Sequence, residues 1–126
     1  MTQLLPRYGR STLADLLPSL GSHLGLPGAE DVLGLPDAPR YLVVLIDGLG
    51  RSLLDDYAAH APFLAGLGDR TITSGVPSTT ATSITSLGTG LAPGAHGIAG
   101  YSFWYPPARQ VLQTLRWPAG IDGLDV

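Results

Sequence analysis

Asp47 and a cluster of hydroxyl residues are the side chains of this 126-residue sequence with the most evident chemistry. Asp47 directly follows an apolar run and is itself followed by Gly48 and Gly50. A carboxylate at the carboxyl end of a buried strand lies where open α/β sheets bind ligands, and it can coordinate Mg²⁺, Mn²⁺ or Zn²⁺. The alternative interpretation is that Asp47 only caps the helix that follows.

The hydroxyl residues are concentrated between Ser78 and Ser86, directly after Pro77. A hydroxyl at the start of a helix meets unpaired backbone amides and the positive end of the helix dipole, and these together favour a phosphate group. A metal ion at the same place would lower the pKa of a threonine or serine hydroxyl and convert it into a nucleophile. Since Ser and Thr are also ordinary N-caps, a purely structural role is the alternative.

A glycine-rich segment from Gly88 to Ile98 follows the hydroxyl cluster and contains His96. It lacks Gly-Lys-Ser/Thr and follows an expected helix, so it fits neither a P-loop nor a dinucleotide-binding loop. His96 could bind a metal, but a single histidine between glycines more often bonds the loop backbone, and we expect a structural role. His23 and His60 belong to no motif and are expected at the surface. The absence of Gly-x-Ser-x-Gly argues against a serine hydrolase.

Short helices and strands are expected to position these groups. Ser11 or Thr12 can cap a helix in the leucine-rich N-terminal region, with Asp15 as the capping-box partner. The continuous apolar run 41–46 is typical of a strand buried on both faces. After it we expect a helix at 52–60, an apolar turn at 63–67, a strand at 71–76, a helix at 79–87, a loop at 88–100 and a strand at 110–115. This alternation predicts an α/β fold.

The composition excludes several classes of protein. Hydrophobic residues make up 44% of the chain and charged residues 13%, which argues against intrinsic disorder. A net charge of −3 with scattered arginines offers no basic surface for a nucleic-acid polymer. With no cysteine, no recognisable signal peptide and no apolar run long enough to span a membrane, we expect a cytoplasmic protein without a membrane partner. The sequence does not indicate an oligomeric state.

The order and spacing of three segments resembles the type I phosphodiesterase/nucleotide pyrophosphatase family, which belongs to the alkaline phosphatase superfamily. The segments are Asp47-Gly48, then Pro77-Ser78-Thr79-Thr80, then Thr89-Gly90 with Pro93 and His96-Gly97-Ile98. The resemblance runs from about residue 41 to residue 100. It implies an alkaline-phosphatase-like α/β/α sandwich, of which this chain would hold the N-terminal part of the core sheet. It also implies two divalent metal ions, zinc or alternatively manganese or magnesium, and a small phosphoester substrate.

The resemblance further implies roles for individual residues. Thr80 corresponds to the nucleophile, which also contacts a metal, and Asp47 corresponds to a metal ligand. Thr79 and Ala81 are expected to contact the substrate from the start of the helix. Tyr101 is expected to do so from the place where relatives that act on nucleotides commonly have an asparagine. Since the chain contains no asparagine, nucleotide specificity is left open.

Two regions are expected, a helical, proline-rich lead-in at 1–40 that packs on the core, and the N-terminal part of a catalytic domain at 41–126. The family's remaining metal ligands are Asp and His residues downstream of the His-Gly loop, whereas this chain has only Asp122 and Asp125 there. We therefore expect a fragment or truncation of a phosphoric ester hydrolase, inactive by itself. The alternative is a truncated or degenerate homologue that serves as a non-catalytic binding or assembly module.

Overall fold

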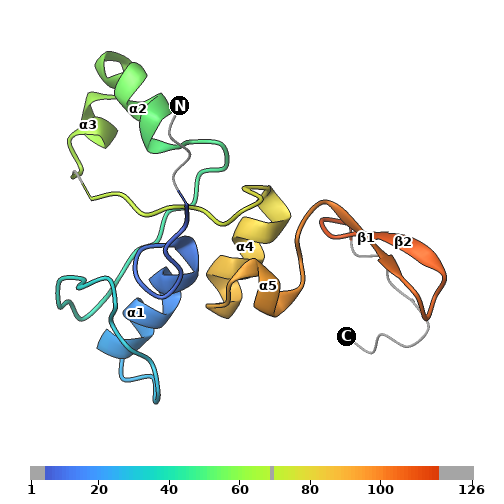
Figure 1. The fold of residues 1–126 in the computed structure, drawn as a ribbon. Helices are drawn as coiled ribbons and strands as arrows, with labels where there is room; N and C mark the ends of the chain where they lie inside the picture. Colours follow the sequence, from blue (N-terminus) through green and yellow to red (C-terminus); the bar gives the residue numbers. More distant parts are fainter. Residues whose placement is uncertain (1–4, 69, 117–126) are drawn as a thin grey trace.

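A computed structural model describes residues 5–68 and 70–116 (Figure 1). Its elements are α-helices (α), short 3₁₀ helices (η) and β-strands (β). In chain order they are η1 (Leu13–Asp15), α1 (Leu16–His23), α2 (Arg51–Asp56), η2 (Ala58–His60), α3 (Pro62–Ala65), α4 (Thr80–Thr89), α5 (Pro93–His96), β1 (Ser102–Tyr105) and β2 (Gln110–Gln113). The two strands form an antiparallel hairpin in which Phe103 lies opposite Leu112. Such a mixture of helices and a two-stranded sheet is compatible with part of an α/β domain. None of the helices in the two described ranges is long and apolar enough to cross a membrane.

The N-terminal helical region begins as the sequence predicts. The backbone N–H and the hydroxyl of Thr12 both donate to Oδ2 of Asp15, each at 2.8 Å. The other carboxylate oxygen of Asp15 accepts the N–H of Gly9 at 2.9 Å. Because this buried carboxylate satisfies amides at the start of the helix, the prediction that Thr12 and Asp15 form a capping box is confirmed.

α4 is the helix that carries the hydroxyl cluster. Its N-cap is Thr79, whose side-chain oxygen accepts the N–H of Thr82. The helix ends at Thr89, and its C-cap is Gly90, which has a φ of 71°, a backbone conformation that a side chain disfavours. A Cβ at position 90 would also lie 2.8 Å from Cγ of Pro18, so glycine allows the end of α4 to approach α1 closely. The predicted helix at 79–87 is confirmed, and it continues to this glycine.

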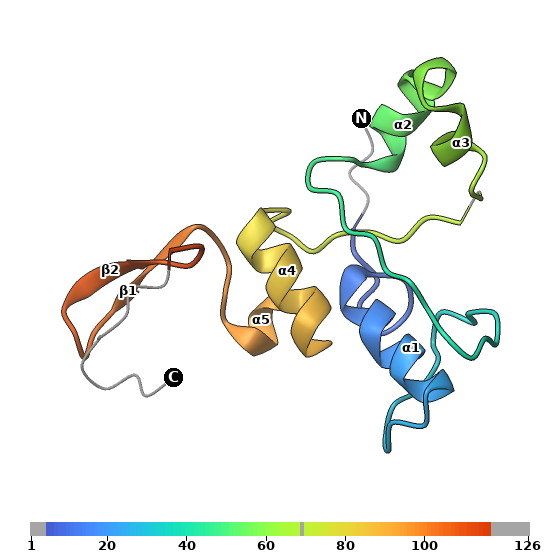
Figure 2. The ribbon, with the colours of Figure 1, turned by 180° about the vertical axis from the view of Figure 1, so that it is seen from behind.

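The small core lies where α4 packs against η1, α1 and α5. Figure 2 shows α4 between α1 and α5, with the α2–α3 region and the β1–β2 hairpin extending away from this group. The buried apolar residues there include Ala14, Leu20 and Ala81. The core therefore holds α4 by its buried face and leaves the start of the helix open.

The segment that leads into α4 is tied to the N-terminal region. Thr73 forms a parallel bridge with Thr12, in which the N–H of Leu13 donates to the Thr73 carbonyl at 2.9 Å. The hydroxyl of Tyr8 accepts the N–H of Val76 at 3.1 Å. The strand expected at 71–76 is thus reduced to one bridge, because no neighbouring segment among the described residues continues the ladder.

The apolar run 41–46 differs most from its prediction. In the structure it is not a strand, and Leu42 and Val44 are 88% and 68% exposed. The prediction of a strand buried on both faces is therefore wrong for this structure. The physical reason is that such a strand needs neighbouring strands to pair with, and no segment in the described part of the chain pairs with this run.

The remaining elements differ from the expected ones mainly in their boundaries. The helix expected at 52–60 is divided into α2 and η2 at Tyr57, and the expected turn at 63–67 is the short helix α3. The expected loop at 88–100 contains α5. The expected strand at 110–115 is β2, and its partner β1 was not anticipated.

His23 fixes the segment between α1 and residue 41. Its Nε2 lies 2.9 Å from Oδ2 of Asp31, and its Nδ1 lies 3.4 Å from Oδ1 of Asp37. The carboxylate of Asp31 also accepts the backbone N–H groups of Leu33 and Leu35. His23, which was expected at the surface, is partly buried, with its side chain 18% exposed, whereas His60 is exposed as expected.

These contacts shift two pKa values in opposite directions. The hydrogen bond that His23 donates to Asp31 is the largest cause that raises the pKa of His23 above its ordinary 6.5. Burial acts to raise the pKa of Asp31, but hydrogen bonds from His23 and from the N–H groups of Leu35 and Gly34 outweigh it and hold that pKa below its ordinary 3.8. The pair therefore favours protonated His23 beside ionised Asp31.

Candidate active site

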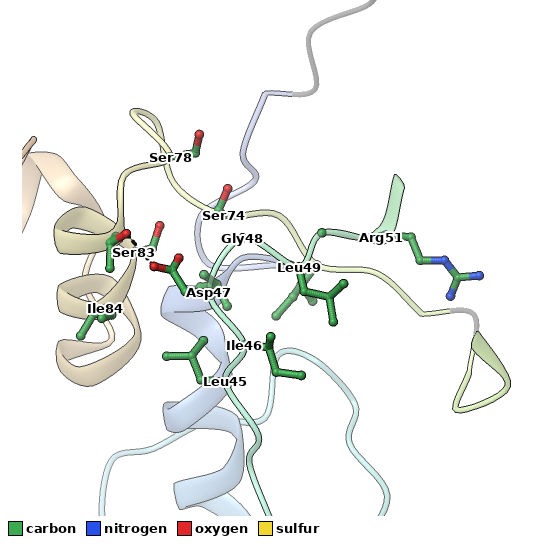
Figure 3. A pocket seen from close by; sticks show the side chains of 14 residues that line it. Leu45, Ile46, Asp47, Gly48, Leu49, Arg51, Ser74, Ser78, Ser83 and Ile84 are labelled. Atoms are coloured by element: carbon green, nitrogen blue, oxygen red, sulfur yellow. Dashed lines mark hydrogen bonds between the residues drawn. The ribbon is translucent and has the colours of Figure 1, made fainter. Parts of the chain in front are cut away.

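Asp47 and Thr80, the two residues predicted to be metal ligands, lie together in the structure. The hydroxyl of Thr80 donates a hydrogen bond of 3.0 Å to Oδ2 of Asp47, which Figure 3 draws as a dashed line. Asp47 stands in the turn that follows the exposed apolar run, and Gly48, with a φ of 75°, allows this turn. Thr80 is the first residue of α4. A contact between residues 33 positions apart thus joins the two halves of the predicted site.

The two residues line an open cavity of about 560 Å³. This volume is within the range of sites for small molecules. The lining combines one carboxylate, four hydroxyl side chains, six aliphatic side chains, one arginine and two glycines. In chain order these are Leu13, Leu45, Ile46, Asp47, Gly48, Leu49, Gly50, Arg51, Ile72, Ser74, Ser78, Thr80, Ser83 and Ile84. The arrangement offers hard oxygen ligands and hydroxyl donors beside an apolar wall.

Arg51 is the cationic side chain of the lining, but its guanidinium is already engaged. Its Nε donates to Asp55 at 2.8 Å and its Nη1 donates to the carbonyl of Gly68 at 2.7 Å. Figure 3 shows the side chain pointing away from Asp47. The donors that face the cavity are therefore mainly neutral hydroxyl groups.

The three residues predicted to contact the substrate lie outside this lining. The hydroxyl of Thr79 caps α4 and donates to Oγ1 of Thr82 at 2.9 Å. Ala81 is buried in the core, and Tyr101 is 60% exposed just before β1. Substrate contact by these residues stays a prediction.

His96 has a structural role. Its Nδ1 accepts the backbone N–H of Ile98 at 3.1 Å, which leaves the proton of the neutral ring on Nε2. Nε2 then donates to the hydroxyl of Ser86 at 2.9 Å. Since both ring nitrogens are occupied in linking α4 to the loop, the expected structural role of His96 is confirmed.

The donor set fits part of the coordination shell of a divalent cation. Carboxylate and hydroxyl oxygens are hard ligands, and 3.0 Å is a separation that two oxygen ligands of one cation can adopt. Within residues 5–68 and 70–116 there is no group of three or more His, Cys, Asp or Glu side chains that could hold a metal. By their chemistry and separation, Asp47 and Thr80 fit two of the ligands of such a cation.

Two hydroxyl residues of the cavity were not singled out from the sequence. Ser83 could have been found, because it is three residues after Thr80 and such residues share one face of a helix. Ser74 gave no such signal, since its position depends on the bridge that the neighbouring Thr73 makes with Thr12.

The comparison with models of known protein families assigns this chain to a family. A family model described as type I phosphodiesterase / nucleotide pyrophosphatase matches residues 41–118, which is more than half of the chain. The matched range includes Asp47, Thr80 and the whole of α4. Neither the comparison with curated proteins nor the comparison with solved structures gave a match.

Proposed function

Because the chain belongs to the type I phosphodiesterase / nucleotide pyrophosphatase family, we propose that it is a metal-dependent hydrolase of phosphate esters with Thr80 as its nucleophile. The observation that carries this proposal is the hydrogen bond of 3.0 Å from Thr80 to Asp47. It places a hydroxyl at the start of a helix beside a carboxylate and in an open cavity. A carboxylate within hydrogen-bond reach of a hydroxyl supports nucleophilic attack by that hydroxyl.

In the proposed reaction Oγ1 of Thr80 attacks phosphorus in line with the leaving group. The bond from phosphorus to the leaving oxygen breaks, a phosphate ester forms on Thr80, and the hydroxyl proton passes to Oδ2 of Asp47 and from there to the leaving oxygen. Water then attacks the same phosphorus, one proton of the water passes to Oγ1 as the bond from phosphorus to Oγ1 breaks, and the product leaves. Because the hydroxyl proton of Thr80 points at Asp47, the lone pairs of Oγ1 are free to face the cavity.

Backbone amides at the start of α4 support binding of the phosphoryl group. The N–H groups of Thr80 and Ala81 lie in the first turn and make no hydrogen bond within the described residues. Unpaired amides at a helix N-terminus attract an anion. Ala81, which is predicted to contact the substrate, makes this contact through its backbone N–H in the proposed complex.

The proposal includes two divalent ions, zinc or alternatively manganese or magnesium, with Asp47 and Thr80 among the ligands. When bound, they supply Lewis-acid stabilisation of the charge that develops during transfer. The substrate is a small phosphoester, and the setting is cytoplasmic, without a nucleic-acid polymer or a membrane as partner.

The test compares the 126-residue chain with its full reading frame on bis-p-nitrophenyl phosphate with zinc or manganese, with bound metal measured by elemental analysis. In whichever of the two proteins is active, Thr80→Ala is expected to lower turnover by about 1,000-fold or more and to leave most of the metal bound. Asp47→Asn is expected to lower both turnover and metal content, because it removes a charged ligand. Turnover by Thr80→Ala at the wild-type rate would refute the assignment of the nucleophile.

A non-catalytic binding or assembly module is the second candidate function. It is favoured by the absence, among the described residues, of a group of three side chains able to hold a metal. If neither the chain nor its full reading frame binds metal or hydrolyses an ester, this function replaces the first. Metal binding with turnover in either protein would exclude it.

A further inference from the structure

The hydroxyl groups of α4 and its N-cap are nearly all engaged within the protein. The engaged side chains are Thr79 with Thr82, Thr80 with Asp47, Thr85 with the Ala81 carbonyl, Ser86 with His96, and Thr89 with the Thr85 carbonyl. Ser83 is the exception, because its Oγ has no hydrogen-bond partner within the residues that the structure describes. Serine in a helix often bonds a carbonyl of the preceding turn, and Ser83 does not.

The unengaged hydroxyl faces the candidate active site. Ser83 lies one helical turn after Thr80, on the same face of α4, and lines the same cavity as Asp47. Figure 3 shows Ser83 beside Asp47. The buried neighbours Ala81 and Thr82 hold this turn of the helix in the core. Ser83 is therefore a fixed donor without a partner, close to the proposed nucleophile.

We propose that Ser83 contacts the substrate and donates a hydrogen bond from Oγ to a non-bridging oxygen of the phosphoryl group that Thr80 attacks. This inference rests on the proposed function. The chain has no asparagine to supply such a donor, and the guanidinium of Arg51 is bonded to Asp55 and Gly68. Ser74 and Ser78 also line the cavity, but they are exposed and stand on a loop. Ser83 is the hydroxyl donor that a helix holds in place.

The expected effect is larger on turnover than on binding, because negative charge on the non-bridging oxygens is best stabilised by a donor that is already in place. With bis-p-nitrophenyl phosphate, Ser83→Ala is expected to lower kcat by about 10-fold to 100-fold and to change KM by less than about threefold. Inhibition by orthovanadate, whose five-coordinate form resembles the transition state, is expected to weaken by a similar factor. Ser83→Thr keeps a hydroxyl at this position and is expected to restore most of the turnover.

Thr89→Ala is the matched control, because it removes a hydroxyl from the same helix outside the cavity. It is expected to leave kcat, KM and orthovanadate inhibition unchanged. If Ser83→Ala also leaves all three unchanged while Thr80→Ala is inactive, the inference about Ser83 is wrong and the proposed function stands. If Thr80→Ala keeps its turnover, or if neither the chain nor its full reading frame hydrolyses a phosphoester, the proposed function fails and this inference fails with it.

Discussion

Two adjacent threonines divide the tasks at the start of α4. Thr79 caps the helix, accepting the N–H of Thr82 and donating to its hydroxyl. Thr80 is consequently free of capping and donates to Asp47. A hydroxyl has a single proton to donate, so one residue could not donate both to the Thr82 hydroxyl and to Asp47. The pair of neighbouring hydroxyls explains how a structural role and a chemical role, which the sequence presents as alternatives, coexist.

A second residue-scale feature is the contact of His23 with Asp31 and Asp37. Because the pKa of His23 is raised above 6.5 in the folded chain, its contribution to stability is full below pH 6.5 and is lost as the pH rises through the raised value. The contribution of Asp31 to stability depends on pH in the opposite direction. Since its pKa is held below 3.8, its contribution is present above pH 3.8 and is lost as the pH falls through the lowered value. The segment after α1 is therefore held most firmly between pH 3.8 and 6.5.

We accordingly predict that the backbone amides of Leu33 and Leu35, which donate to Asp31, are better protected from hydrogen exchange at about pH 5.5 than at about pH 8.5. Protection factors, corrected for the intrinsic exchange rate, are the quantity to compare. His23→Gln should remove this pH dependence, and His60→Gln, at an exposed position, should keep it. Equal protection at both pH values in the wild-type chain would contradict the prediction.

At the scale of elements, η1 depends on one buried carboxylate. Asp15 accepts hydrogen bonds from the N–H of Gly9 and from the N–H and hydroxyl of Thr12. η1 packs on α4, and the adjoining bridge between Thr12 and Thr73 holds the segment that leads to α4. Asp15 thus supports the position of the candidate site without contacting it.

Asp15→Ala is predicted to lower the free energy of unfolding by about 3 kcal/mol, since it leaves several buried donors without an acceptor. Urea denaturation followed by circular dichroism measures this change. Asp56→Ala is the control, because Asp56 is exposed and has no side-chain hydrogen bond in the described ranges. It should change the free energy by less than about 0.5 kcal/mol. Similar values for the two variants would show that the Asp15 contacts contribute little.

At the scale of the whole molecule, the most unusual feature is the exposed apolar run 42–46. All five of its side chains are at least 41% exposed. Its backbone N–H groups make no hydrogen bond to another described residue. A β-rich segment without charge or proline, exposed in this way, associates readily with other chains.

We predict that the 126-residue chain associates as its concentration rises and that Val44→Lys reduces this association. The added charge opposes contact between apolar segments, and Val44 is 68% exposed, so the fold has little to lose. Sedimentation velocity at matched concentrations gives the measurement. Leu67→Lys adds the same charge at a side chain that is 65% exposed outside the run, and it should have a smaller effect. If both variants sediment like the wild type, the run does not drive association.

Features that depend on neighbouring residues can be predicted from the sequence alone. The Thr12 and Asp15 capping box, the helix that starts after Thr79 and the hydrogen bond of His96 to the loop backbone all follow from residues within a few positions of each other. Local backbone preference and short-range hydrogen bonds fix such features, so the pattern of residues predicts them.

The fold of the whole chain fixes the features that join distant residues. It brought Asp47 within 3.0 Å of Thr80, paired His23 with Asp31, and left the run 41–46 exposed where the sequence predicted a buried strand. The physical reason is that burial and long-range contacts depend on which segments pack together. The composition of an apolar run favours its burial. Whether the run is buried depends on which other segments of the fold pack against it.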